Sequence, residues 1–138
     1  MAEIDYAFLA EFAKVEPHGV LTVVGASWTF VEAAQFPMSY RMSVACRVRA
    51  TIDEGPIPFS VMFRGPTVAT MPITIGAEGL LEAGPNTHPY GPDNRLGHLF
   101  AMDMQVLLSE PGLYEVLIEL PEHGDRRRLA FDAMRTGG

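Results

Sequence analysis

The chain has 138 residues, of which 48% are hydrophobic and 20% are charged. This length and balance are typical of one globular domain with its own core, and they exclude a disordered or fibrous chain. The formal net charge of −7 argues against nonspecific binding to nucleic acid or to an anionic membrane. We therefore expect a single domain over residues 1–138 whose partner is a protein.

Cysteine use and the apolar stretches bear on the compartment. Cys46 is the only cysteine, which excludes an internal disulfide and a thiolate metal cluster. It lies on the apolar side of a predicted strand, so we interpret it as a small core residue rather than a nucleophile. No apolar stretch is long enough to span a bilayer, and the acidic start MAEIDY does not resemble a signal peptide. These features predict a cytoplasmic protein.

Residues 4–15 (IDYAFLAEFAKV) fit both a strand of period two and a helix with one apolar stripe. We favour the strand, because residues 16–19 (EPHG) form a turn by composition and the apolar, β-branched run 20–24 follows it. This order predicts a β-hairpin. Residues 27–31 (SWTFV) then form either a short strand or an irregular bridge.

The clearest strand covers residues 38–50, where almost every second residue is apolar. Successive side chains of a strand point to opposite faces, so this pattern predicts one dry face and one wet face. The dry face comprises Met38, Tyr40, Met42, Val44, Cys46 and Val48, and the wet face comprises Ser39, Arg41, Ser43, Ala45, Arg47 and Arg49.

Similar segments continue to the C-terminus. Strands are expected at residues 59–64, 67–75, 98–108, 114–120 and 126–133, and the tail 134–138 is expected to be frayed. Pro72 would place the strand 67–75 at an edge or bulge, because proline cannot donate to a ladder. Seven or eight strands joined by tight turns predict an all-β fold, a two-sheet antiparallel β-sandwich of the immunoglobulin-like or jelly-roll-like type.

Residues 110–114 (EPGLY) have the acid-x-Gly-x-Tyr order that is found near the tyrosine corner of immunoglobulin-like sandwiches. In such a corner the phenol hydroxyl bonds to nearby backbone and holds a strand crossover. A plain turn followed by a core tyrosine explains the same residues.

The segment 76–97 contains the highest density of glycine and proline, and we interpret it as one long loop in which residues 79–83 can still form a short strand or a turn of helix. Its candidate binding residues are His88, Tyr90, Asp93, Asn94 and Arg95. They can form a recognition site or simply a solvated loop. Trp28 is the candidate outside this loop: it is either a core residue or a stacking platform for a sugar or a partner.

Residues 126–128 are the densest basic run, and on a strand Arg126 and Arg128 share one face. One interpretation is a charged edge that prevents edge-to-edge aggregation. The other is a guanidinium clamp for a carboxylate or phosphate on a partner. Arg41, Arg47 and Arg49 would join such a patch only if their strand were a neighbour.

Catalytic and metal-binding motifs are missing from the sequence. There is no complete G-x-S-x-G elbow, no P-loop and no G-x-G-x-x-G turn. The four histidines are far apart, and none of their spacings is that of a zinc site. We expect no catalytic residue, no metal and no cofactor.

Residues 5–10 (DYAFLA), 19–25 (GVLTVVG) and 111–114 (PGLY) resemble a family of small uncharacterised bacterial proteins, mainly actinobacterial. Its members begin D-Y-A-F-L-A-[DE], turn through a glycine into L-x-V-x-G and end with P-G-x-Y. His18-Gly19-Val20 stands where a Gly-Lys pair is usual in that family. The resemblance implies a cytosolic all-β domain and favours the strand for residues 4–15. It carries over no catalytic residue.

These observations predict a non-enzymatic protein-interaction or structural module. We expect it to associate with itself, as a homo-oligomer, through a sheet edge or an exposed face. The alternative is a β-sandwich that binds a small ligand or glycan through loop 76–97 and Trp28.

Overall fold

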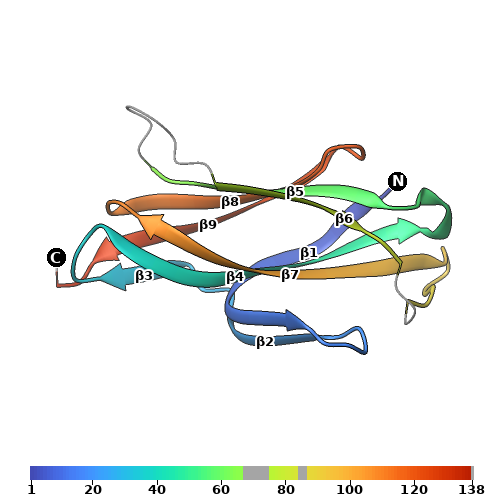
Figure 1. The fold of residues 1–138 in the computed structure, drawn as a ribbon, viewed down its shortest axis with the longest axis horizontal. Helices are drawn as coiled ribbons and strands as arrows, with labels where there is room; N and C mark the ends of the chain where they lie inside the picture. Colours follow the sequence, from blue (N-terminus) through green and yellow to red (C-terminus); the bar gives the residue numbers. More distant parts are fainter. Residues whose placement is uncertain (67–74, 84–86, 138) are drawn as a thin grey trace.

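The computed structural model describes residues 1–66, 75–83 and 87–137. Nine strands form two sheets that pack face to face (Figure 1), with the orders β2-β1-β4-β7 and β3-β9-β8-β5-β6. The predicted all-β sandwich is confirmed. The strands are β1 (Glu3–Val15), β2 (Leu21–Ala26), β3 (Phe30–Ala33), β4 (Met38–Thr51), β5 (Ile57–Arg64), β6 (Ile75–Leu81), β7 (Arg95–Leu108), β8 (Gly112–Leu120) and β9 (Asp125–Arg135).

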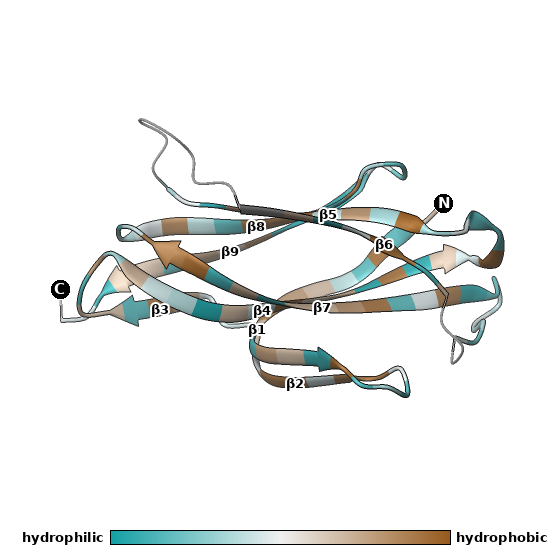
Figure 2. Ribbon diagram, in the orientation of Figure 1, coloured by the Kyte–Doolittle hydropathy of each residue, from teal (hydrophilic) through white to brown (hydrophobic). Residues whose placement is uncertain are grey.

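The core lies between the two sheets and follows the period-two pattern. Apolar and polar residues alternate along most of the strands in Figure 2, and the buried positions of β5, β7 and β8 fall on every second residue. On β4 the predicted dry face points into this core, where Met42, Val44, Cys46 and Val48 have no exposed surface. Burial there raises the pKa of the Cys46 thiol to about 12, so the thiol is neutral at physiological pH.

Aromatic rings fill one end of the core, and the tyrosine corner is present there. Tyr114 stacks against Phe63 and Phe131, with ring centroids 5.7 and 5.6 Å away. Its hydroxyl donates to the carbonyl of Glu110 at 2.7 Å and accepts from the N–H of the same residue at 3.2 Å. The bonds join the turn before β8 to the core, which is the role predicted for this tyrosine.

β1 changes its partner at Ala10, and this bend places the β1–β2 hairpin over the sandwich. Residues before the bend pair with β4, whereas residues 12–15 pair with β2 alone among the described strands. In Figure 1 the hairpin lies below the layer that contains β4 and β7. Its Ala13, Leu21 and Val23 pack with Phe8, Ala45 and Ala101 in a second apolar cluster outside the main core.

The predicted wet face of β4 is therefore only partly wet. Ser43 and Ala45 were placed on that face, yet they are 1% and 0% exposed. The hairpin covers Ala45, and the Ser43 hydroxyl donates to a carboxylate oxygen of Asp103 on β7 at 2.6 Å. Period two predicted which face these residues share, but a third layer decided whether water reaches that face. Residues 4–15 form a strand, as favoured.

The long loop predicted over residues 76–97 is wrong at both of its ends. Residues 75–81 form β6, which pairs with β5, and β7 already begins at Arg95. Gly79 serves packing rather than a turn, because a Cβ there would lie 2.7 Å from the ring of Phe59. The strand predicted at 67–75 lies, except for its last residue, outside the described residues.

The tail 134–138 was predicted to be frayed, but the chain remains in a strand up to Arg135. Met134 and Arg135 belong to β9 and pair with Glu32 and Ala33 of β3, and the Thr136 N–H donates to the Ala33 carbonyl at 2.9 Å. β3 runs parallel to β9, so one parallel pair joins the predicted antiparallel ladders. Among the residues that the structure describes, no helix is long and apolar enough to cross a membrane.

The tyrosine corner gives a first prediction. We expect Tyr114→Phe to lower the free energy of unfolding by about 1–2 kcal/mol, because two backbone groups of Glu110 lose their shared partner while the stacked ring remains. Urea unfolding followed by fluorescence measures the change. The control is Tyr90→Phe, at a ring that is 41% exposed. An equal effect of the two substitutions would contradict the corner.

The third layer gives a second prediction. Ala45→Leu inserts three carbon atoms between β4 and the hairpin, and we expect it to cost about 1–3 kcal/mol of stability. Ala26→Leu, at an exposed position of β2, should change stability by less than about 0.5 kcal/mol. Thermal and urea unfolding provide the measurement, and a neutral Ala45→Leu would show that the hairpin does not cover this face.

Candidate functional site

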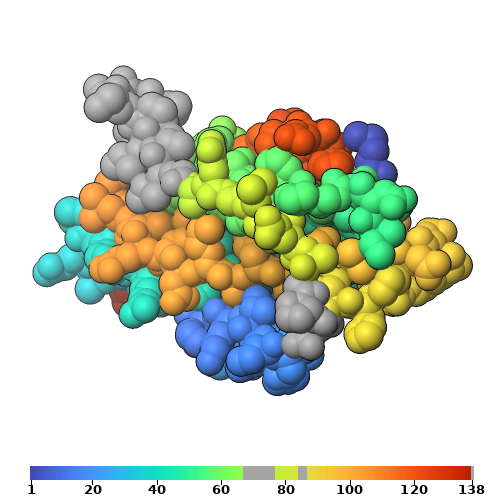
Figure 3. Space-filling model, turned by 45° about the vertical axis from the view of Figure 1, so that its right-hand side comes forward, coloured from blue at the N-terminus to red at the C-terminus, as the bar shows by residue number. Residues whose placement is uncertain are grey.

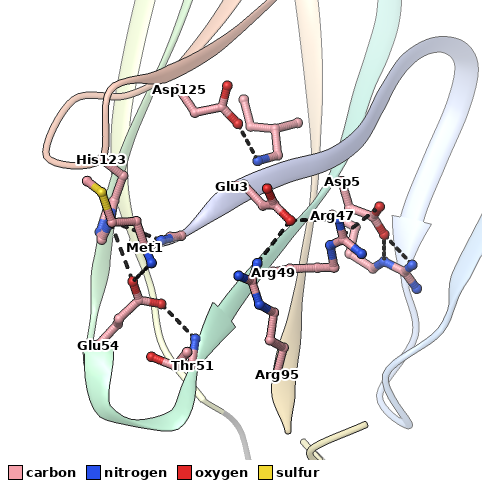
Figure 4. A network of polar contacts seen from close by, with 12 residues as sticks. Met1, Glu3, Asp5, Arg47, Arg49, Thr51, Glu54, Arg95, His123 and Asp125 are labelled. Atoms are coloured by element: carbon pink, nitrogen blue, oxygen red, sulfur yellow. Dashed lines mark hydrogen bonds and ion pairs between the residues drawn. The ribbon is translucent and has the colours of Figure 1, made fainter. Parts of the chain in front are cut away.

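Five charged residues form a cluster on the outer surface of β1, β4 and β7 (Figure 4). Glu3 on β1 accepts hydrogen bonds from Arg49 at 2.6 Å and from Arg95 at 2.9 Å. Asp5 accepts from Nε of Arg47 at 2.7 Å and also from its Nη2, and it lies 3.6 Å from Nε of Arg49. We call these five residues the arginine cluster. It holds three guanidinium groups and two carboxylates.

Arg47 is held by rings as well as by Asp5. Its guanidinium carbon lies 4.9 Å from the centroid of the Tyr6 ring and 5.7 Å from that of Tyr90, which are cation–π distances. A Cβ at Gly97 would come within 3.4 Å of the Arg47 side chain and 3.6 Å of the Tyr90 ring. The lack of a side chain at Gly97 thus lets both groups lie close over β7.

A groove of about 440 Å³ opens next to Arg47. The hairpin contributes Val15 and Gly19 to its lining, β7 contributes Gly97, His98 and Leu99, and the segment after β6 contributes Glu82, His88 and Tyr90. We call it the Arg47 groove. Its volume is within the range of small-molecule sites, and its lining mixes apolar, aromatic and charged side chains. It is the candidate site that the hairpin and the β6–β7 connection build together.

His98 is the buried titratable group of this groove, with 6% of its surface exposed. Burial lowers its pKa below the usual value, and a hydrogen bond to the backbone of Glu82 and the carboxylate of Glu54 oppose this shift. The imidazole is therefore neutral at pH 7. Its inward position on β7 gives it a packing role between the sheets.

The first half of β1 is also tied to the opposite sheet. The N–H of Ile4 donates to Asp125 at 2.7 Å, and its carbonyl accepts from Nη2 of Arg127 at 2.9 Å. The Ala2 N–H donates to Nδ1 of His123 at 3.1 Å. These contacts occupy backbone groups on the edge of β1 that faces away from β4. That edge is thus closed to further strand pairing.

β7 presents the longest open edge among the described strands. It has 14 residues, pairs with β4 on one side and has no described strand on the other. Figure 3 shows β7, in orange, at the surface between the blue hairpin and the yellow-green β6. Residues 97–99 of β7 belong to the Arg47 groove, so the open part covers residues 100–108. We call this part the β7 edge.

A hollow of about 200 Å³ lies beside the β7 edge, between the two sheets. Its apolar lining comes from Val61 and Ala77 of one sheet and from Met102, Met104 and Val106 of the other. Met102 and Met104 therefore lie where the sandwich is open at its side. Flexible methionine side chains suit such a rim, because they can repack against a second surface.

The structure brings some of the predicted site residues together and separates others. His88 and Tyr90 line the Arg47 groove, and Arg95 belongs to the arginine cluster. Asp93 and Asn94 are exposed in the turn that follows Gly91, and the N–H of Asn94 donates to the Gly91 carbonyl at 3.3 Å. These two residues shape the turn before β7 and do not line the groove.

Trp28 is remote from this site. It packs edge-on against Tyr40 and Phe131, with ring centroids 5.7 and 5.0 Å away, beside the main core. Tyr40 lies near the start of β4, whereas Tyr90 bridges to Arg95, which pairs with Thr51 at the far end of β4. The combined site of Trp28 and loop 76–97 is therefore not formed, and the core interpretation of Trp28 fits its surroundings.

Arg126 and Arg128 lie on the outer surface of the other sheet. Arg128 is 3.5 Å from Glu115, and Arg126 lies opposite Glu119 on β8. β3 pairs only with residues 132–135 of β9, so the basic run lies on an edge stretch of β9. This position fits the interpretation as a protected edge. Arg47 and Arg49 are in the other sheet and do not join these arginines.

Sequence reasoning missed the acidic half of the arginine cluster and the ring of Tyr6. Glu3 and Asp5 were read as part of an acidic start, and Tyr6 as one member of an alternating run. Arg47 and Arg49 were assigned to an outer face, which is correct. The missing signal is the pairing of β1 with β4, which are not consecutive in the chain.

Comparisons with known proteins add no assignment. No protein-family model matches the chain, and a search of curated proteins gave no match. The resemblance to an actinobacterial family stays a prediction. Within the described residues, no group of three or more histidine, cysteine or acidic side chains is placed to hold a metal ion.

The buried imidazole gives a pH prediction. Because folding lowers the pKa of His98, the unfolded chain binds more protons, and the free energy of unfolding must fall as the pH drops below about 6.5. We expect His98→Gln to flatten this fall between about pH 7.5 and about pH 5.5. Urea unfolding at several pH values is the measurement. His18→Gln, in an exposed turn, should keep the wild-type slope, and an unchanged slope in His98→Gln would refute the assignment.

Proposed function

We propose that the protein is a non-enzymatic protein-interaction module that pairs with a second copy of itself along the β7 edge. The observation that carries the proposal is the contrast between this edge and the others. An open strand edge is a template for another strand unless charges, prolines, bulges or short length prevent pairing. The β7 edge has none of these protections except a single charge, Asp103.

Among the strands that the structure describes, the other edges are short, charged or occupied. β2, β3 and β6 have 6, 4 and 7 residues. The open stretch of β9 carries three consecutive arginines, and the open edge of β1 is occupied by Asp125 and Arg127. Natural sheets protect their edges in these ways. The unprotected stretch 100–108 of the 14-residue strand β7 therefore supports a pairing role.

The sequence of the β7 edge is complementary to itself in one antiparallel register. Antiparallel pairing about a two-fold axis at Met104 places Ala101 opposite Leu107, Met102 opposite Val106, Asp103 opposite Gln105, and Met104 opposite its own copy. Apolar residues then face apolar residues, and the Gln105 amide can donate to the Asp103 carboxylate. A register centred on Asp103 would instead place two carboxylates opposite each other.

The pairing would also cover apolar surface. Leu107 is 46% exposed in the single chain, and the hollow lined by Met102 and Met104 opens at the same side. A contact between two edges is small, so we expect a reversible dimer of micromolar affinity. The buried free Cys46 is in keeping with a reducing compartment, and the proposal places the module in the cytoplasm.

Charge substitutions at Gln105 test the register. Gln105→Glu puts a carboxylate opposite Asp103 of the second copy, and we expect it to weaken the dimer roughly 2- to 25-fold through its two symmetric pairs. Gln105→Lys should strengthen the dimer by a similar factor. Sedimentation equilibrium measures both. Gln35→Glu and Gln35→Lys, at an exposed position in the bend before β4, change the net charge equally and should shift the affinity less.

Cysteine trapping tests the same geometry independently. Met104→Cys places two thiols on the two-fold axis at a Cα separation that permits a disulfide, whereas Met102→Cys places them about 13 Å apart along the strands. Only Met104→Cys should cross-link under oxidation, and the buried Cys46 should not react. A strictly monomeric chain at about 1 mM, or equal trapping of both variants, would overturn the proposal.

A further inference from the structure

The Arg47 groove carries an inference that does not depend on self-association. We propose that it binds a small carboxylate with a flat, apolar body, and that Arg47 receives the carboxylate. Two independent features of the described residues support this ligand class: a surplus of guanidinium donors and an exposed aromatic ring in the lining of the groove.

The arginine cluster has more donors than acceptors. Three guanidinium groups share two carboxylates, which leaves one positive charge in excess on a chain of net charge −7. Asp5 uses Nε and Nη2 of Arg47, and Nη1 makes no hydrogen bond to a described residue. Nε of Arg49 and Nε of Arg95 also have no hydrogen-bond partner, but both atoms are buried and neither arginine lines the groove, so Arg47 is the donor that a ligand can reach. A monoanion supplies the acceptor and the charge that the cluster lacks.

The side chains that line the groove determine which uncharged part of a ligand fits beside the carboxylate. The Tyr90 ring is 41% exposed and flanks Arg47, and the lining also includes the aliphatic side chains of Val15 on the hairpin and Leu99 on β7. A flat apolar group can stack on the ring while it covers the aliphatic side chains.

Glu82 sets the orientation of the ligand. It is the acidic residue on the described lining of the groove, and its carboxylate repels an anion. The ligand therefore keeps its carboxylate at Arg47 and directs its body toward Tyr90 and Leu99. The neutral His98 beneath the groove adds no positive charge at pH 7, so the recognition of charge comes from Arg47 and its cluster.

Benzoate is the probe, and the measurement is an NMR titration of the full chain that carries Gln105→Glu to weaken self-association. We expect saturable shifts of the Gly97 and Leu99 amides with Kd on the order of 1–10 mM, which is ordinary for so small a ligand. Benzamide, the neutral isostere, should cause no saturable shift. Equal shifts with both probes, or none with benzoate, would overturn the proposal.

Variants separate this site from nonspecific contact with arginines. The double variant Asp5→Asn with Arg47→Gln removes both charges of the pair and should weaken benzoate binding by at least about tenfold. Arg126→Gln, which removes an exposed arginine from the other sheet, should leave the affinity unchanged, and Glu82→Gln should raise it. Tyr90→Ser, at an exposed ring, tests the stacking if the double variant fails to fold. Loss of binding in Arg126→Gln alone, or full binding in Tyr90→Ser and in the double variant, would overturn the site.

Discussion

The bend of β1 at Ala10 is the constraint on which the rest of the structure depends. Before the bend, β1 is the third strand of a sheet and its far edge is occupied by side chains of β9. After the bend, the same strand forms a hairpin that packs over the outer surface of that sheet. Ala10 is fully buried at the pivot and pairs with Ser43 and Ala26. A small side chain there lets three strands meet without a void or a clash.

This path of β1 shapes the Arg47 groove. The β7 edge lies at the opposite end of the sheet from β1 and β2, and the hairpin packs over the outer face without pairing with that edge. The tip of the hairpin reaches the start of β7, where Val15 and Gly19 form one wall of the Arg47 groove. A sheet in which β1 and β2 simply continued side by side would have neither the groove nor the covered Ala45.

The path of β1 also determines which charged side chains meet. The chain is acidic as a whole, yet β1 brings Glu3 and Asp5 against three arginines of β4 and β7. Most of these contacts are partly exposed, so each adds little to stability. Their value is geometric: they fix the Arg47 guanidinium between Tyr6 and Tyr90. A positioned, incompletely satisfied guanidinium is what an anionic ligand requires.

Much of the fold could be derived from residue order alone. Period two identified the inward residues of β4, β5, β7 and β8, and the E-P-G-L-Y run identified the tyrosine corner, because both signals are local in the chain. At residues 75–81 the composition favoured a loop, but these residues form a strand. Gly79, a residue type typical of turns, instead allows close packing against Phe59. Of the predicted site residues, His88 and Tyr90 line the groove, Arg95 lies beside it, and Trp28 packs beside the core at the other end.

Two features could not be predicted from the sequence: which distant strands pair, and which outer face of a sheet is covered by another layer. Tertiary contacts determine both. Alternation is the same whichever strand lies next to another, so it cannot show that β1 pairs with β4 or that Asp5 meets Arg47. It also cannot show that Ser43 and Ala45, on a face that reads as wet, are dry beneath a third layer and a neighbouring carboxylate. The local sequence pattern thus determined which residues form strands and share a face. Packing between residues far apart in the sequence determined which edge stays open and where a groove forms.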